Sequence, residues 1–277
     1  MKPGRASGWG VIPYVMVVIG LLVLPAMGVL QLSFKTDNGA SAAFGLSNYA
    51  RIFEAYYLNI VTRTIELALL ATAIELVLAF PLAYALARAT PRIKSLLTLA
   101  VMIPLMTSVV VKAFGWYILM TDDGLMTRLA QSLGISRSPL AGTPFAVIIA
   151  MVEFGLPFMV LSLATAIEKI PRNLEEAALN LHASPLYVLW HVLLPLSRSG
   201  ILSGFLLCFG VSASAYVIPA MLGGTKVKMA AQVVFDDVLV AFNWPGAAAI
   251  STVLLILLSS ILYISLVAGG SRHENRS

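Results

Sequence analysis

Residues 170–195 read IPRNLEEAALNLHASPLYVLWHVLLP and form the longest polar, helix-patterned interruption in a chain of long apolar runs. The first half predicts a helix with one apolar face, because four residues follow the i, i+3, i+4, i+7 spacing: Leu174, Ala177, Ala178 and Leu181. Asn173 with Glu176 three residues later is typical of an N-cap and its reciprocal acid. Ser184-Pro185 indicates a second helix start. Two short helices at a sharp angle, outside a bilayer, would expose a docking surface.

The composition excludes a soluble globular domain. Hydrophobic residues make up 59% of the chain and charged residues only 11%, which indicates an integral membrane protein. The single cysteine, Cys208, excludes an internal disulfide and a cysteine-rich metal site. The net charge of +5 is modest and spread over loops and ends. It therefore favours membrane-orientation signals over a nucleic-acid partner.

Six apolar segments predict an all-α integral membrane protein with six transmembrane helices in one domain, residues 1–277. Each segment is long enough to cross a bilayer at 1.5 Å per residue, and the spans are about 11–32, 62–87, 96–120, 144–167, 199–222 and 247–269. A cleaved signal peptide is the alternative for the first segment, since Ala26-Met27-Gly28 has small residues at a suitable spacing. That segment is longer than a usual signal core, which favours an uncleaved span.

The distribution of Lys and Arg predicts the orientation in the membrane. If the N-terminus is cytoplasmic, one side carries ten of them and the other seven, with Lys112 inside the third span. The ten lie in the shorter loops, where positive charge is expected to mark the cytoplasmic side. We therefore expect both termini and the loop 169–198 to be cytoplasmic, and the docking surface to face the cytoplasm.

The chain offers no recognisable energy source or catalytic set of its own. No G-x-x-x-x-G-K-[ST] phosphate loop is present, and Gly223-Gly224-Thr225-Lys226 lacks its spacing. No histidines and carboxylates have metal-ligand spacing, and no G-x-S-x-G nucleophile elbow occurs. Active transport by this chain would need a partner or an ion gradient.

The loop also carries a recognisable motif. Glu176-Ala177-Ala178, three residues, His182, nine residues, Val192, one residue and Leu194-Pro195 have the spacing E-A-A-x3-G-x9-I-x-L-P. This pattern resembles the EAA motif of the membrane subunits of bacterial binding-protein-dependent ABC importers. Other stretches are similar to the spermidine/putrescine permease group, namely 46–49 (LSNY), 81–88 (PLAYALAR), 156–161 (LPFMVL), 194–197 (LPLS) and 243–245 (NWP).

The resemblance implies a type I ABC importer permease fold in which the loop forms a coupling helix that sits in a groove of a separate ATPase subunit. It implies two ATP-binding subunits, a second permease subunit and a periplasmic solute-binding protein in a bacterial inner membrane. ATP and Mg²⁺ would bind the ATPases, so this chain is expected to be neither an enzyme nor a cofactor protein. Glu176 would be the charged contact, although it could also cap its own helix. The implied coupling residues are Glu175, Glu176, Ala177, Ala178, His182, Ala183 and Pro195.

One coupling residue departs from the family pattern. His182 stands where the family has glycine, at a turn that needs φ above zero. Histidine is enriched among the non-glycine residues that adopt such angles, so we expect the turn to survive with a changed contact to the ATPase. A pH-sensing role for His182 is the alternative.

Charged residues inside predicted spans are candidates for the translocation path, because their burial is costly without a partner or a function. A cationic substrate such as a polyamine, or a similar small solute, would explain acids along that path. Alternatively, the acids pair with Lys112, backbone groups or a second permease, and the small polar residues are ordinary helix packing. The candidates are Glu66, Glu75, Lys112, Glu153, Ser212, Ser214 and Tyr216.

A rival hypothesis is a secondary transporter that uses Glu66, Glu75 or Glu153 as a proton or ion site. No inverted repeat is visible in the six spans, and such a transporter would leave the cytoplasmic amphipathic segment without a purpose. A membrane-embedded enzyme comes third, because the chain lacks a catalytic constellation.

Overall fold

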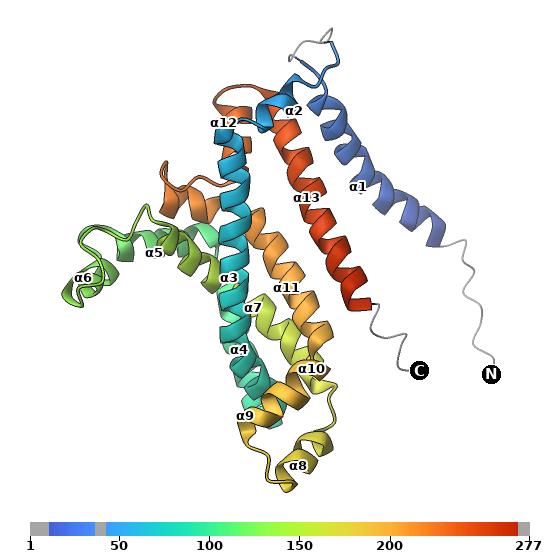
Figure 1. Cartoon of the computed structure of the whole chain (residues 1–277), viewed down its shortest axis with the longest axis vertical. Coiled ribbons are helices and arrows are strands. Elements are labelled where there is room, and N and C mark those ends of the chain that lie inside the picture. Colours follow the sequence, from blue (N-terminus) through green and yellow to red (C-terminus); the bar gives the residue numbers. More distant parts are fainter. Residues whose placement is uncertain (1–10, 37–42, 271–277) are drawn as a thin grey trace. The chain divides into compact units, whose positions relative to one another are not determined.

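The computed structural model describes residues 11–36 and 43–270, and these residues are mostly helical (Figure 1). The elements of the N-terminal half are α1 (Val11–Ser33), α2 (Ser47–Ile52), α3 (Ala55–Arg88), α4 (Pro91–Met106), α5 (Val109–Met120) and α6 (Leu125–Ser132). The C-terminal half comprises α7 (Pro144–Glu168), α8 (Arg172–Asn180), α9 (Pro185–Val188), the π-helical turn η2 (Leu189–Leu193), α10 (Leu194–Leu196), α11 (Arg198–Ala213), the π-helical turn η3 (Pro219–Gly223), α12 (Ala230–Leu239) and α13 (Trp244–Gly270). The predicted all-α architecture is confirmed.

The described residues contain four single helices long and apolar enough to cross a membrane: α1, α3, α7 and α13. Two bent pairs also qualify, so the number rises to six if each pair is one span. One pair joins Pro91–Met106 to Val109–Ser132 at 88°, and the other joins Pro185–Leu196 to Arg198–Ala213 at 72°.

The third predicted span, 96–120, is not one continuous helix. α4 ends at Met106, and Thr107 takes an extended backbone conformation before α5 begins at Val109. Pro104 lies in the last turn of α4, where it supplies no backbone N–H and favours a break nearby. Hydropathy is uniform across such a break, which explains why the sequence predicted a single span.

The fifth predicted span, 199–222, is also divided. α11 ends at Ala213, and helical geometry resumes at Val217, two residues before η3 begins at Pro219. At the end of α11 both the backbone N–H and the hydroxyl of Ser214 donate to the Gly210 carbonyl oxygen, at 3.2 and 2.8 Å. Pro219 lies in the first turn of this helical piece, where backbone N–H groups have no helical partner, so its missing N–H is tolerated there.

The described residues divide into two compact units, residues 11–36 and 43–58 with 233–257 and residues 59–232 with 258–270, and each is described by itself. In the first unit, hydrogen bonds fold the segment after α1 back on α2. The Ser33 and Tyr49 hydroxyl oxygens lie 2.6 Å apart, and Asn48 Nδ2 donates to the Lys35 carbonyl oxygen at 2.7 Å. Asn48 and Tyr49, the last two residues of the LSNY stretch at 46–49, therefore hold α2 against the segment that follows α1.

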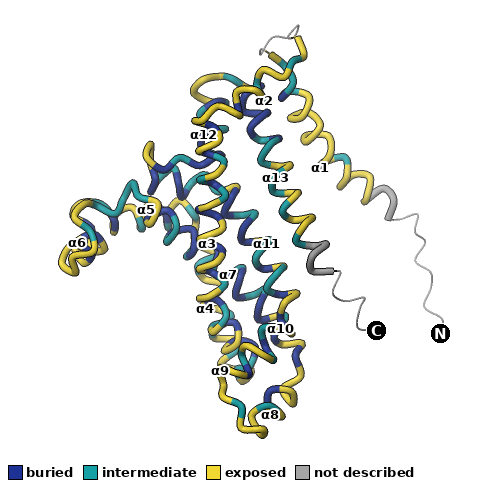
Figure 2. The backbone as a smooth tube through the Cα atoms, in the orientation of Figure 1, coloured by how far each residue is buried: buried dark blue, intermediate teal, exposed yellow. Residues whose placement is uncertain are grey.

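The second unit is built around α7. This helix packs along α11, contacts α4 and α5, and is largely buried, in contrast to α8 and α9 (Figure 2). Its buried side chains join two hydrophobic clusters, one around Met120, Met151 and Leu222 and the other around Met159, Leu163 and Ile167. The unit therefore has a well-packed interior from which the loop between α7 and α11 emerges.

Two glycines of α11 allow the close approach to α7. A Cβ atom at Gly200 would collide with the Ala166 side chain, and one at Gly204 would collide with the sulfur of Met159. Small residues at a helix–helix contact are typical of membrane proteins, where close backbone approach replaces the hydrophobic driving force. The α7–α11 pair therefore depends on glycine at these two positions.

We predict that Gly200→Ala destabilises the protein by about 1–3 kcal/mol, because the added methyl group overpacks a tight contact. Ala166→Gly in the same chain removes the opposing methyl group and restores most of the loss. Thermal unfolding of the purified chain in detergent measures both effects. Gly210→Ala, also on α11 but with nothing within 4 Å of its added Cβ, is the control and should cost nothing. If Gly200→Ala and Gly210→Ala lowered the stability equally, that result would contradict a tight contact at Gly200.

Candidate functional site

The loop between α7 and α11 contains two short helices, as the sequence predicts. α8 spans Arg172–Asn180, and α9 begins at Pro185 with Ser184 as its N-cap. The Ser184 hydroxyl accepts a hydrogen bond from the Tyr187 backbone N–H at 3.2 Å, which confirms the second predicted start. The predicted first cap is wrong: α8 begins at Arg172 with Pro171 as N-cap, so Asn173 lies inside the helix.

The turn between α8 and α9 has the geometry expected at the position of the motif glycine. His182 has φ of 60°, which confirms the predicted left-handed conformation. Its backbone N–H donates to the Leu179 carbonyl oxygen at 2.9 Å, and that of Ala183 donates to the Ala178 carbonyl oxygen at 3.2 Å. These two bonds form a Schellman motif, in which His182 occupies the position most often taken by glycine.

The loop rejoins the membrane helices through a second bend. α9, η2 and α10 run as one helical piece from Pro185 to Leu196, and α11 then departs at 72°. Ser197, buried at this bend, donates its hydroxyl hydrogen to the Leu193 carbonyl oxygen at 2.7 Å. Pro195, the last residue of the motif, lies in α10 just before the bend.

Burial on α8 is the reverse of that in an ordinary amphipathic helix. The predicted apolar face is turned outward, with Leu174 43% and Leu181 83% exposed. Glu175 is the only buried residue of α8, whereas Glu176 and Ala177 are exposed and Ala178 is half-buried. α8 therefore exposes both an apolar face and the Glu176 carboxylate, the two features that the sequence predicted for a docking surface.

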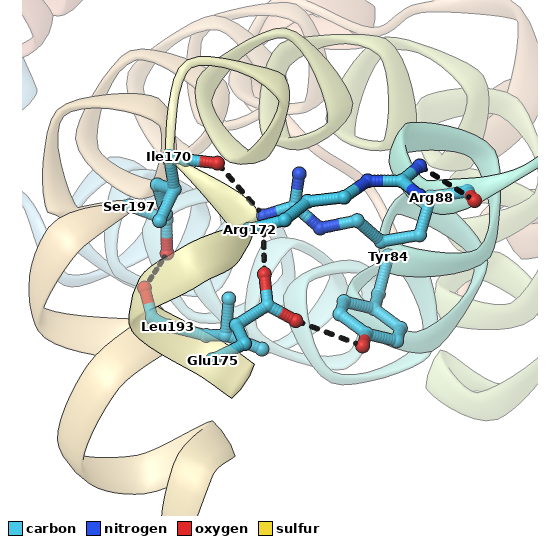
Figure 3. Close-up of polar contacts among 7 residues, drawn as sticks. All are labelled: Tyr84, Arg88, Ile170, Arg172, Glu175, Leu193 and Ser197. Carbon is cyan, nitrogen blue, oxygen red and sulfur yellow. Dashed lines mark hydrogen bonds and ion pairs between the residues drawn. The ribbon is translucent and has the colours of Figure 1, made fainter. Parts of the chain in front are cut away.

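Glu175 is held by the end of α3 (Figure 3). One carboxylate oxygen accepts a hydrogen bond from the Tyr84 hydroxyl at 3.0 Å, and the other forms an ion pair with Arg88. Arg88 also donates to the Ile170 carbonyl oxygen at 3.0 Å, and Arg172 donates to the Arg88 carbonyl oxygen at 2.9 Å. No sequence pattern predicted this cluster. The available signal was the spacing of Tyr84 and Arg88, which lie one helical turn apart at the end of an apolar span.

Two of the predicted path residues pair with each other. Lys112 on α5 lies 3.0 Å from a carboxylate oxygen of Glu153 on α7, and its ammonium group also lies 5.1 Å from the centre of the Phe154 ring. A carboxylate and an aromatic face together compensate the cost of a charge within an apolar bundle. The alternative interpretation, in which acids within the spans pair with Lys112, is therefore confirmed for Glu153.

The other path candidates are separate. Glu75 on α3 is completely buried, and neither of its oxygens has a hydrogen-bond partner among the described residues. A Cβ atom at Gly155 on α7 would collide with its carboxylate. Glu66, also on α3, is exposed. Ser212 is buried near the end of α11, Ser214 caps that end, and Tyr216 lies in the break before η3. Among the described residues no three His, Cys, Asp or Glu side chains form a group that could hold a metal ion.

Comparison with known proteins identifies the family. A family model described as the inner membrane component of binding-protein-dependent transport systems matches residues 11–269. The chain belongs to this family of ABC importer permeases. The chain is 31% identical over 252 residues to spermidine/putrescine transport system permease protein PotB of Haemophilus influenzae. The match covers 89% of this chain and 88% of that protein. PotB of Escherichia coli K12 is 31% identical over 259 residues, 90% of this chain and 94% of that protein.

Solved structures share the permease fold. A bacterial alginate ABC transporter, in complex with an alginate pentasaccharide-bound periplasmic protein, matches with a TM-score of 0.77 and 15% identity over 95% of both chains. The inward-facing MetNI methionine ABC transporter matches with a TM-score of 0.57 and 18% identity, over 79% of this chain and 95% of that chain. The predicted type I importer permease fold is thereby confirmed. The family consists of inner-membrane transport permeases rather than enzymes.

We predict that the permease tolerates His182→Gly but not His182→Val. Glycine adopts φ of 60° freely, whereas a β-branched residue pays about 1–2 kcal/mol or more in the left-handed region. Amide hydrogen exchange of residues 182 and 183 reports the opening of the two Schellman hydrogen bonds. We expect exchange roughly tenfold faster in the valine variant, since about 1.4 kcal/mol corresponds to a factor of ten. Unchanged exchange in that variant would contradict a turn maintained by the left-handed conformation.

Proposed function

We propose that this permease receives the movement of separate ATPase subunits through residues 170–195 and converts it into opening and closing of a substrate path. The observation that carries the proposal is the outward apolar face of α8, with Leu174 and Leu181 exposed, together with the exposed carboxylate of Glu176. Exposed apolar helix faces are characteristic of helices that dock in a protein groove. Ala177 and Ala178 allow close approach, and Glu176 supplies a charge for a basic partner residue.

The complex that fits this role contains two ATP-binding subunits, a second permease subunit and a solute-binding protein. The family description, which names binding-protein dependence, supports the last of these. ATP and Mg²⁺ would be held by the ATPases, and this chain would do no covalent chemistry. ATP binding would close the subunits around α8 and its counterpart, and the transmembrane helices would then open toward the binding protein.

The orientation that we propose places both termini and residues 169–198 in the cytoplasm. Six crossings return the chain to the side on which it began, and that side carries ten Lys and Arg residues against seven. This orientation places α8 on the side where ATP is available. A cysteine-labelling experiment with a membrane-impermeant maleimide at residue 181 would test the placement.

The cargo that we propose is a polyamine. PotB of Haemophilus influenzae and of Escherichia coli, both about a third identical to this chain, are named as spermidine/putrescine permeases. Among the acids within the spans, Glu153 is already paired with Lys112, which leaves Glu75 as the buried carboxylate without a hydrogen-bond partner. A cationic cargo would offset the cost of that acid when the surrounding helices separate.

Glu176→Lys tests the coupling. We expect the variant, expressed with its neighbouring transport genes, to lose ATP-driven uptake into vesicles by at least about tenfold. The cause is electrostatic, because reversing a charge in a desolvated contact places two like charges together. The matched control is Glu168→Lys, the same charge reversal at an exposed residue whose ion pair with Lys94 contributes little. It should leave uptake within about twofold of the original chain.

Two results would overturn the coupling proposal. One is failure of any ATPase subunit to co-purify with the unaltered chain. The other is uptake by the chain alone, driven by a proton gradient and indifferent to Glu176→Lys. The second result would support secondary transport through Glu66 or Glu75 instead.

The cargo is tested by stimulation of ATP hydrolysis in the reconstituted complex with its binding protein. We expect putrescine or spermidine to stimulate hydrolysis, and 1,4-butanediol, a chain of similar length without charges, to have no effect. The physical reason is that 1,4-butanediol carries no positive charge that could pair with an acid of the path. Stimulation by the diol, or by neither polyamine, would contradict a polyamine cargo.

A further inference from the structure

The attachment of α8 to the membrane helices is unusually polar. α8 has one buried residue, Glu175, and its other faces are exposed or half-buried. A cleft of about 770 Å³ with an apolar lining lies between α3 and η2, bordered by Phe80, Tyr84, Glu175 and Trp190. Ile170, just before α8, belongs to the same hydrophobic cluster as Ala83 and Leu86 of α3. The side chains of α8 itself, in contrast, reach α3 through hydrogen bonds and an ion pair.

Four interactions join the end of α3 to the start of α8 in both directions (Figure 3). From α3, Tyr84 and Arg88 hold the Glu175 carboxylate, and Arg88 also donates to the Ile170 carbonyl oxygen. From α8, Arg172 donates to the Arg88 carbonyl oxygen. The Arg88 carbonyl lies in the last turn of α3, where carbonyl groups lack helical partners and attract cations. Each helix therefore satisfies a backbone group of the other segment.

Burial makes this cluster more rigid than an ordinary surface ion pair. The side chains of Arg88 and Glu175 are only 13% and 10% exposed. The exposed pair Lys94–Glu168, which joins α4 to the end of α7, has exposures of 43% and 37%. Water competes with the exposed pair, but it reaches the buried pair poorly, so the buried pair resists separation more strongly. Displacement of α8 should therefore draw the end of α3 with it.

The other end of the loop is attached differently. α9, η2 and α10 continue covalently into the bend at Ser197 and so into α11. Movement at the docking surface reaches α11 through this continuous chain. α3, by contrast, is more than 80 residues away in sequence and can follow only through noncovalent contacts.

We propose that Glu175, Arg88 and Tyr84 form a positioning cluster that transmits displacement of α8 to α3. The inference rests on the proposed coupling function and adds a division of roles between neighbouring acids. Glu176 faces the ATPase, whereas Glu175 faces inward and links the docked helix to the second transmembrane span. Neither Arg88 nor Tyr84 needs to contact the ATPase or the cargo for this role.

The test compares Glu175→Gln and Tyr84→Phe with the control Glu168→Gln in the full reconstituted complex. Co-purification of the ATPase measures assembly, and ATP hydrolysed per solute imported measures transmission. We expect Glu175→Gln to assemble and to raise the ATP cost per solute at least about tenfold, because ATPase movement no longer reaches α3. Tyr84→Phe, which removes one hydrogen bond, should raise it about twofold to fivefold, and Glu168→Gln should leave it unchanged.

A purely structural role predicts a different result. Uptake and ATP hydrolysis would then fall in the same proportion in both variants, and this outcome would overturn the proposal. If Glu175→Gln fails to assemble with the ATPase, the Tyr84→Phe variant provides the test. An unchanged ratio of ATP hydrolysed to solute imported in Tyr84→Phe would also overturn the proposal. The double variant Glu175→Arg with Arg88→Glu restores opposite charges and should recover part of the transmission. Loss of ATPase binding by the unaltered chain would instead refute the proposed function.

Discussion

The close packing of α11 on α7 is the constraint on which the second unit depends. Gly200 and Gly204 leave room for Ala166 and Met159, so the two helices approach more closely than bulkier residues would permit. Residues 169–197 connect these two helices, so the ends of this segment are fixed by that contact. A docking loop can transmit movement only if its ends belong to a stiff element, because a compliant pair of helices would absorb the displacement.

At α8 a different kind of interaction becomes necessary. α8 exposes its apolar face, so burial of that face cannot also hold the helix against its own chain. The remaining option is a small polar cluster, and such a cluster is strong only where water is largely excluded. Arg88 and Glu175 meet this condition at the end of α3. The same requirement explains why the one buried residue of the helix is charged rather than apolar.

Local chemistry allowed much of the loop to be predicted from sequence. The cap at Ser184 and the left-handed turn at His182 depend on a few neighbouring residues, and both predictions were correct. The start of α8 was misplaced because Pro171, already extended, takes the cap position ahead of Asn173. The helix breaks at Thr107 and after Ala213 were missed because hydropathy does not register backbone geometry. The link between Arg88 and Glu175 joins positions 87 residues apart, and no periodic pattern connects them.

The adjacency of Glu175 to Glu176, the first residue of the motif, now has a geometric explanation. Successive residues of an α-helix point about 100° apart, so neighbouring side chains cannot serve the same contact. With Glu175 directed at α3, Glu176 necessarily points away from it, and the structure leaves Glu176 exposed. The inward contact of Glu175 thus fixes the rotation of α8 about its own axis. A helix fixed in rotation presents Glu176 and its apolar face in one orientation, as the proposed transmission of movement in a defined direction would require.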